Sequence, residues 1–294
     1  QQFFATTGSG SYYIPSCTFF ELVNSRKDLL PIYIANVTIA SLTINTVTDI
    51  RKFVGSDSGN ELILSSDSNT VGQFYSVEAL KNWVNNFGGK NNKVKLKGDF
   101  TFTTNLDLSG FTKKVKFDGT DANITLSLGA RIVLGSNVTV DGFVISYSAA
   151  GFSASAGTLL SYGQAAFYCS TTVQNVCIEN CTVTWSSTDR RPPFVLFEMA
   201  KGQVNKNISI KNNIFIDTTP TTTIGALQAA VAFVAMNTGV STDPALLINC
   251  YISGNQCSHN QGIYVTTATL TDPGLNCVNV VIEKNNCGVI GVLP

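Results

Sequence analysis

The chain has 294 residues, enough for one large all-β domain or two smaller ones, and 44% of them are hydrophobic, which can supply a continuous core. Only 13% are charged, and 19 Lys and Arg balance 19 Asp and Glu, so no long-range field gathers phosphates or anionic lipids. We therefore expect no nucleic-acid partner. The longest apolar stretch, Ala229 to Met236, is far shorter than the roughly 18 residues that cross a bilayer, so we expect no membrane insertion.

The cysteine and histidine content limits the chemistry further. One His and eight Cys without a Cys-x-x-Cys pair make a metal site unexpected, and we expect neither a metal nor a cofactor. An even cysteine count with scattered spacing is typical of disulfides in an oxidising compartment, and buried free thiols in a virion protein would give the same pattern. We expect the protein outside the cell or on a virion surface, and the thiol state stays open.

Residues 1–72 differ in pattern from the rest of the chain. They are aromatic at first and then alternate in Val37–Ile39 and Leu42–Ile44. We predict a small β-rich N-terminal module or attachment arm here, followed by a second domain over 73–294.

One helix is predicted, over residues 76–87. Ser76 can cap it, Glu78 lies in the first turn, and apolar residues recur at helical spacing until Gly88 and Gly89 end it. The remaining segments are short and β-like, separated by Gly, Asn and Asp. The sequence therefore predicts an all-β domain with one capping helix.

A repeat runs through the β-like part of the chain. The triplets Leu96–Gly98, Phe117–Gly119 and Val140–Gly142 follow alternating segments at separations of 21 and 23 residues. Such a period is that of one turn of a β-solenoid. Later members of the series, spaced by about 32 to 38 residues, are 178–181, 210–213, 247–250 and 282–287.

A second match supports this alignment. Residues 194–202 match 231–239 at an offset of 37, and Ile210 to Leu247 gives the same offset. We therefore predict at least two strands in each repeat. Asn tolerates left-handed backbone angles, and stacked Asn amides can bond to the repeats above and below, so an Asn column is predicted at the bend. Its expected members are Asn180, Asn212, Asn249 and either Asn285 or Asn286.

These features together resemble the pectin-lyase-like right-handed parallel β-helix superfamily. The features are a capping helix at 77–87, the strand Val94–Phe100, and turns of the Ile178-x-Asn180 type. Bacteriophage tailspikes and surface-polysaccharide depolymerases are the members that the chain most resembles, over about residues 76–290. The resemblance implies an all-β fold, a single-stranded right-handed parallel β-helix behind a capping helix. It carries little functional specificity, because the fold holds enzymes, adhesins and inert spikes.

Glycan-cleaving members of that superfamily use a carboxylate pair or a cation-assisted base. The Asp cluster of the pectate-lyase pattern is missing, and so is the polygalacturonase pattern. The remaining catalytic candidates are Glu198, Asp217 and Asp189, which ordinary surface charge would also explain.

Aromatic and basic side chains supply candidates for sugar binding. Amphipathic rings suit sugar faces, and core or inter-subunit packing would also explain them. The candidates are Tyr162, Trp185, Arg190 and Tyr264. Cys250 and Cys287 fall near one column, so a bridge between neighbouring repeats is a candidate disulfide, with a column of buried thiols as the alternative.

Three functions remain open from the sequence. The leading hypothesis is a homotrimeric spike or fibre-type surface protein that binds a host or environmental glycan. This hypothesis favours binding without catalysis. The alternative is a polysaccharide depolymerase, a hydrolase or lyase that uses a carboxylate pair. A third is a capsid or surface decoration protein with no ligand, which contacts other virion or surface proteins.

Overall fold

The structure of the chain, a computed structural model, forms two compact units. The first comprises residues 1–98 and 111–121, and the second comprises residues 99–110 and 122–294. The residues that the structure describes are 12–13, 37–39, 42–44, 61–67, 74, 76–127, 129–148, 165–186, 193–218, 229–236, 242–258, 262–267, 274–287 and 289–292.

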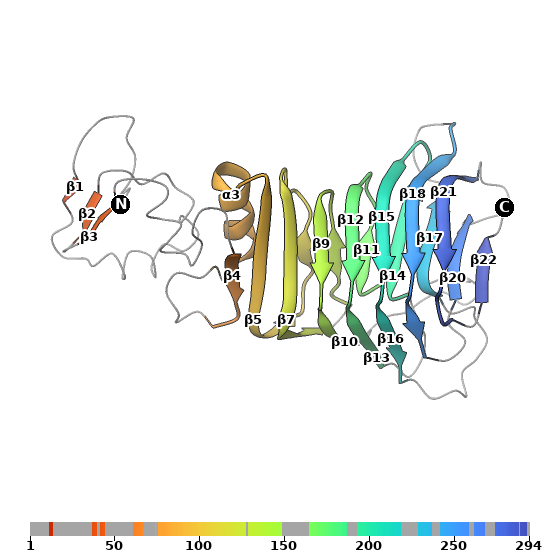
Figure 1. Ribbon diagram of the computed structural model, residues 1–294, viewed down its shortest axis with the longest axis horizontal. Helices are drawn as coiled ribbons and strands as arrows, with labels where there is room; N and C mark the ends of the chain where they lie inside the picture. The colour runs from red at the N-terminus through yellow and green to blue at the C-terminus, as the bar shows by residue number, and fades with distance from the viewer. Residues whose placement is uncertain are drawn as a thin grey trace. The chain divides into compact units, whose positions relative to one another are not determined.

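The first unit contains helix α3, Val77–Phe87, which confirms the predicted helix (Figure 1). Ser76 is its N-cap, and the Ser76 Oγ accepts a hydrogen bond from the Ala79 amide at 3.4 Å. The apolar face buries Leu80 and Trp83 almost completely. Gly88 leaves the helical conformation, so the helix ends where the sequence predicts.

The strands of the first unit include the two segments whose alternation predicted them. β2 and β3 pair in antiparallel orientation, and β1 pairs with β2 in parallel. β4 pairs in parallel with the first part of β5. The bounds are β1 Tyr12–Tyr13, β2 Val37–Ile39, β3 Leu42–Ile44, β4 Glu61–Ser65, β5 Asn91–Phe102 and β7 Lys114–Leu126, of which β5 and β7 continue into the second unit.

The second unit consists of short strands that pair in parallel, and the part of the chain that the structure describes contains no helix after α3. Its strands are β6 Leu106–Leu108, β8 Ile132–Leu134, β9 Val138–Asp141, β10 Val144–Ser148, β11 Phe167–Cys169, β12 Gln174–Glu179, β13 Thr182–Ser186, β14 Val195–Ala200, β15 Val204–Lys211, β16 Ile214–Asp217, β17 Ala229–Met236, β18 Ala245–Ser253, β19 Gln256–Cys257, β20 Gly262–Thr267, β21 Leu275–Glu283 and β22 Val289–Val292.

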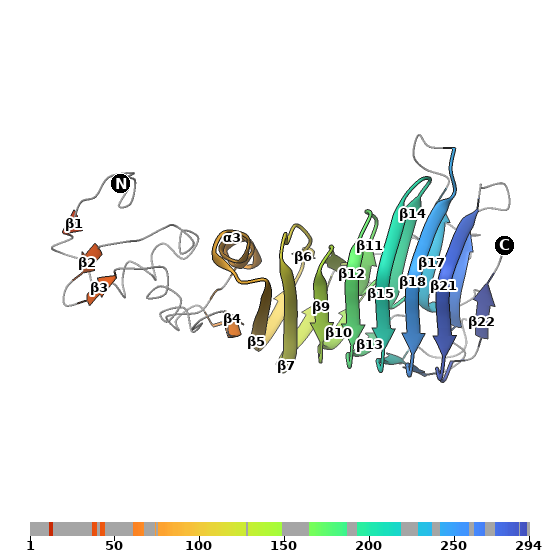
Figure 2. The ribbon, with the colours of Figure 1, turned by 45° about the horizontal axis from the view of Figure 1, so that its top comes forward.

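Each strand from β9 to β18 pairs with the strand three places later in the chain. β9, β12, β15, β18 and β21 therefore lie side by side in that order, as both views of the ribbon show (Figure 1; Figure 2). β10, β13, β16 and β19 form a second strip, and β8, β11, β14, β17, β20 and β22 lie in a separate sheet. We call each run of three consecutive strands that begins in the first strip a repeat, for example β12, β13 and β14. Stacked parallel sheets built in this way are compatible with a β-helix-like solenoid.

The core lies between the sheets and is built from side chains that stack from one repeat to the next. The rings of Phe197 and Phe233 stack with centroids 4.7 Å apart, and those of Phe194 and Phe215 at 5.1 Å. All four side chains are buried. Phe197 and Phe233 are register partners on β14 and β17, so one ring packs on its counterpart in the next repeat, whereas Phe194 and Phe215 join the two sheets across the core.

The predicted alignment of the repeats is wrong in two places. Ile210 pairs with Ile252, not with Leu247, so the offset there is 42 residues. Val195 pairs with Val231, an offset of 36 where the sequence match gave 37. The register of a parallel ladder is fixed by which side chains face the core. A local sequence match does not fix the register in a chain rich in Ala, Val and Ile.

Candidate functional site

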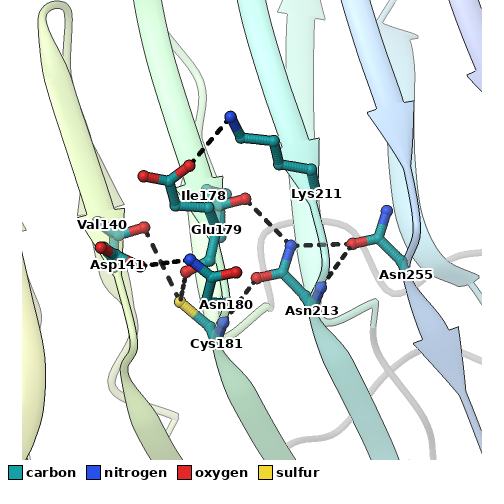
Figure 3. Close-up of polar contacts among 9 residues, drawn as sticks. All are labelled: Val140, Asp141, Ile178, Glu179, Asn180, Cys181, Lys211, Asn213 and Asn255. Atoms are coloured by element: carbon teal, nitrogen blue, oxygen red, sulfur yellow. Dashed lines mark hydrogen bonds and ion pairs between the residues drawn. The ribbon is translucent and has the colours of Figure 1, made fainter.

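Two columns of Asn side chains run across the repeats along the strip β12, β15, β18 and β21. The first column is buried, at the bend that follows these strands. Asn213 Oδ1 accepts a hydrogen bond of 2.9 Å from the Cys181 backbone amide (Figure 3). Asn213 Nδ2 donates a hydrogen bond of 2.9 Å to Asn255 Oδ1. Asn255 donates in the same way to Asn285 at 2.8 Å. We call these residues the inner Asn column.

A left-handed residue stands at the bend of each of five successive repeats. φ is positive at Gly142, Asn180, Asn212, Gly254 and Lys284, which follow one another in register. The last three of them precede Asn213, Asn255 and Asn285, the members of the inner Asn column. The left-handed backbone predicted at Asn180 and Asn212 is thus confirmed, and the Asn180 side chain donates to Asp141 Oδ1 at 2.7 Å. Glycine and Asn adopt it at low cost, whereas Lys284 does so against its steric preference.

A second column lies on the outward face of the same strip and contains Asn249, which the sequence alignment had assigned to the bend. Asn175 donates to Asn137, Asn207 to Asn175, Asn249 to Asn207, and Asn279 to Asn249, each through side-chain amides at 2.9 to 3.1 Å. All five residues have φ between 54° and 65°. We call them the outer Asn column.

The outward face also carries a polar pair and an exposed ring. Lys211 and Glu179, in register on β15 and β12, form an ion pair of 3.1 Å (Figure 3). Tyr251 on β18 is 38% exposed, and its hydroxyl donates to Glu283 on β21 at 2.7 Å. Val281, which pairs with Tyr251, is 44% exposed. The Tyr251 ring therefore lies at the surface in an orientation set by Glu283.

We define the β18–β21 patch by the outward side chains around this ring. Its residues are Asn249, Tyr251, Val278, Asn279, Val281 and Glu283. The hydrogen bond from Tyr251, followed by the nearby positive charge of Lys284, lowers the pKa of Glu283, so this carboxylate is ionised at neutral pH. The patch thus combines apolar surface, amide groups and a carboxylate acceptor.

Sequence reasoning missed both Tyr251 and Glu283. A signal was present, since Tyr251 follows an Asn–Cys pair in the same pattern as Ser209 follows Asn207–Ile208. The outer Asn column inserts one left-handed residue into each strand, and this shifts which residues of the strand point outward.

Glu198 lies on β14, on the opposite face of the strand from Phe197 and Met199, which are buried. Its Oε2 accepts a hydrogen bond of 2.6 Å from the Tyr168 hydroxyl. Burial, followed by this bond, raises the pKa of Tyr168. The Arg131 guanidinium lies 3.7 Å from the centroid of the Tyr168 ring. Arg131, Tyr168 and Glu198 therefore form a connected polar group on this sheet.

Asp217 lies in a different environment from Glu198. It pairs with Trp185, is 2% exposed, and shares its face of β16 with the buried Phe215. Its amide donates to Ser258 Oγ at 2.7 Å. Because Glu198 and Asp217 lie in different sheets and Asp217 faces the core, the structure does not bring these two carboxylates together. Asp189 lies outside the described residues.

Two of the predicted sugar-binding aromatics are buried. Trp185 is 2% exposed and packs on Tyr147, with ring centroids 4.6 Å apart. Tyr264 is 4% exposed and belongs to an apolar cluster with Leu196 and Ala232. Strand alternation turns Trp185 toward the core, whereas Tyr264 lies on the face of its sheet opposite to Phe233 and Val265 and is covered there. Neither ring offers a face to a sugar. Tyr162 and Arg190 lie outside the described residues.

The candidate disulfide between Cys250 and Cys287 is not formed. Both are free thiols, as are the other five described cysteines. Cys250 pairs in register with Val280, and the ladder that joins Gln256 to Asn286 places Cys287 opposite Cys257. The register therefore separates Cys250 from Cys287.

Comparisons with known proteins give no relatives, since no protein-family model, curated protein or solved structure matches the chain. Within the described ranges, no three His, Cys, Asp or Glu side chains gather as ligands of a metal ion. Nor does that part of the chain contain a helix long and apolar enough to cross a bilayer.

Proposed function

We propose that the second unit is a right-handed parallel β-helix of the pectin-lyase-like and tailspike type. The support is the pairing of each strand from β9 to β18 with the strand three places later, which is the pairing expected if every repeat is one coil. Connections between parallel strands of one sheet are right-handed in about 98% of cases, and this sets the hand that we propose. The inner and outer Asn columns repeat from one coil to the next, which a regular stack of coils would produce.

We further propose that the protein is a spike or fibre-type surface protein that binds a glycan through the β18–β21 patch. One observation carries this proposal: Tyr251 exposes its ring while Glu283 fixes the hydroxyl at 2.7 Å. A ring held in place loses little conformational freedom when a ligand binds, so the stacking energy is retained.

The chemistry of the patch suits a sugar. The Tyr251 ring with Val278 and Val281 offers apolar surface to the C–H face of a pyranose, and the Asn279 amide and the Glu283 carboxylate can pair with hydroxyl groups. The ionised Glu283 would repel a uronate or sulfate. We therefore propose a neutral or amino-sugar-containing glycan as the ligand.

Self-association is proposed on a different strip. Val144 and Ile214 are 45% and 40% exposed and lie in one outward column, with Thr182 between them in register. We propose that this column packs in a homotrimer and that the trimer is displayed outside the cell or on a virion. Exposed apolar side chains on a strip of low charge favour such a contact.

A glycan array tests the binding proposal. Wild-type protein, Tyr251→Ala and Thr184→Ala, an outward residue of β13, are applied to neutral, amino-sugar and acidic glycans. We expect wild type and Thr184→Ala to bind the same neutral or amino-sugar glycans and Tyr251→Ala to lose them. Equal binding by all three variants would contradict the site, and binding of none would favour the decoration protein.

The same glycans are then followed for new reducing ends and for ultraviolet absorbance from unsaturated sugars. We expect no products. Products that vanish in Glu198→Gln or Asp217→Asn would replace our proposal with the depolymerase.

A further inference from the structure

Two cysteines on successive repeats lie directly opposite each other. The Cys257 amide donates to the Asn286 carbonyl at 2.9 Å, and the Asn286 amide donates to the Asn255 carbonyl at 2.8 Å. This parallel pairing sets Gln256 opposite Asn286 and therefore Cys257 opposite Cys287. Neighbouring strands are about 4.8 Å apart, which falls within the range of about 4.4 to 6.8 Å between Cα atoms that a disulfide spans.

Both thiols also point to the same side. Cys257 pairs in register with Phe215, a buried core residue, and Cys287 continues that column. Each of the two cysteines is a free thiol of intermediate burial, so neither is fully enclosed. Cys250 and Cys277 differ, because Cys250 pairs with Val280 and Cys277 pairs with Leu247.

The strand that precedes Cys287 is less buried than its neighbour. Every described side chain of β21 is intermediate or exposed, whereas β18 buries five of its nine residues. No strand in the described part of the chain pairs with the outer edge of β21. Elements with few buried contacts open more readily, so a covalent link from Cys287 to Cys257 would restrain this repeat.

We propose that Cys257 and Cys287 are a disulfide-forming pair that reacts with a low-molecular-weight disulfide, such as glutathione disulfide, and ties the last repeat to its neighbour. In the first step one protein thiolate attacks a sulfur of the small disulfide, forms a mixed disulfide and releases one small thiolate. The second protein thiolate then attacks the protein sulfur of the mixed disulfide and releases the second small thiolate. The two protons lost by the cysteines pass to the two released thiolates, so the small disulfide is reduced as the pair is oxidised.

The electrostatics of the pair predict how the reaction depends on pH. Burial, followed by the charge of Cys287, raises the pKa of Cys257 to about 12, and burial also raises the pKa of Cys287. Since only the thiolate reacts, the bond forms slowly at neutral pH and faster as the pH rises.

Disulfide mapping tests the proposal. Reduced protein is incubated with glutathione disulfide at mildly alkaline pH, alkylated, digested without reduction and analysed by mass spectrometry. We expect one linked peptide pair that joins Cys257 to Cys287 with the loss of two hydrogens. The link disappears in Cys287→Ser and persists in the matched double variant Cys250→Ser/Cys277→Ser. Recovery of both residues as alkylated thiols, or a link from Cys287 to any other cysteine, would overturn the proposal.

Thermal unfolding supplies a second readout that does not depend on glycan binding. The bond closes a ring between residues 257 and 287, which restricts the unfolded chain. We expect oxidised wild type to melt at a higher temperature than reduced wild type, and Cys287→Ser to show no such shift. An equal melting temperature of oxidised and reduced wild type would contradict the proposed role in holding the last repeat.

Discussion

Asn213 and Asn255 occupy the same position in successive repeats, and the Nδ2 of the first donates to the Oδ1 of the second at 2.9 Å. The Asn213 backbone amide donates to the same oxygen at 3.1 Å. Both side chains are buried, with exposures of 0% and 1%. The bond therefore lies in a low-dielectric interior, where a lost partner leaves a polar group unpaired at full cost.

Asn213→Ala should lower the free energy of unfolding by about 3 kcal/mol, because the Cys181 amide and the Asn255 side chain each lose a buried partner. Denaturant unfolding measures the change. Ser136→Ala is the control, because it removes an exposed hydrogen bond from the Gln174 amide at 3.1 Å, and a loss of about 1 kcal/mol is expected. Similar losses in the two variants would show that the inner Asn column has no special role.

Lys284→Asn should raise the free energy of unfolding by about 0.5 to 1 kcal/mol. Lys284 has a φ of 56°, in the column where the other members are Gly and Asn, and Asn tolerates that conformation. Lys206→Asn, on an exposed position of β15 outside that column, should be neutral or destabilising. Stabilisation by both substitutions, or by neither, would argue against backbone strain at Lys284.

Stability should fall at alkaline pH through the buried thiols. Burial raises the pKa of Cys181 from 9.0 to about 12. Well below pH 9 the thiol is neutral in both the folded and the unfolded chain, so its contribution to the free energy of unfolding does not change with pH. Between pH 9 and 12 the unfolded chain releases the proton while the folded chain retains it, so stability decreases by up to about 1.4 kcal/mol per pH unit.

Denaturant unfolding at a series of pH values measures this slope. Cys181→Ala should make it shallower by up to that amount, whereas Cys277→Ala, at an exposed thiol, should change it less. An unchanged slope in Cys181→Ala would contradict the assignment to this thiol.

Ile214→Asp should dissociate the proposed trimer. A charge in the column of Val144 and Ile214 would have to be desolvated at the interface, so the variant should elute as a monomer while wild type has three times the chain mass in light scattering. Ile248→Asp, on the strip of the outer Asn column, is the matched control and should stay trimeric. A monomeric wild type would exclude the trimer.

Local signals predicted the fold well where the physics is local. The helix at Val77–Phe87 has a cap, an apolar face and a glycine stop within a few residues, and each of them is visible in the sequence. The bend at Asn180 and Asn212 was likewise readable, because few residues accept a left-handed backbone.

The register between repeats was not readable in the same way. The true period is the pattern Asn, apolar, any residue, Ile or Val, which begins at Asn137, Asn175, Asn207, Asn249 and Asn279. Its spacings of 38, 32, 42 and 30 residues vary because the connections between strands differ in length. A search for a constant offset therefore found 37 residues, whereas the true offset is 36 at Val195 and 42 at Ile210.

The site depends on that register, which is why its residues were missed. Aromatic residues with a polar edge suit both cores and sugar surfaces, and the sequence does not distinguish the two. Trp185 follows the buried phase of its strand and Tyr264 lies in a strand that is buried on both faces, whereas Tyr251 follows a left-handed Asn that places it outward. Only the pairing of β18 with β21 brings Glu283 to its hydroxyl.

Calorimetric titration of a bound glycan with wild type, Tyr251→Phe and Tyr251→Ala tests the central claim most directly. Tyr251→Phe keeps the ring and removes the bond to Glu283, so we expect it to weaken binding by about threefold to tenfold. Tyr251→Ala removes the stacking face, so we expect a loss of at least about tenfold. Equal affinities for the three proteins would place the glycan elsewhere and contradict the assignment of the β18–β21 patch as the binding site.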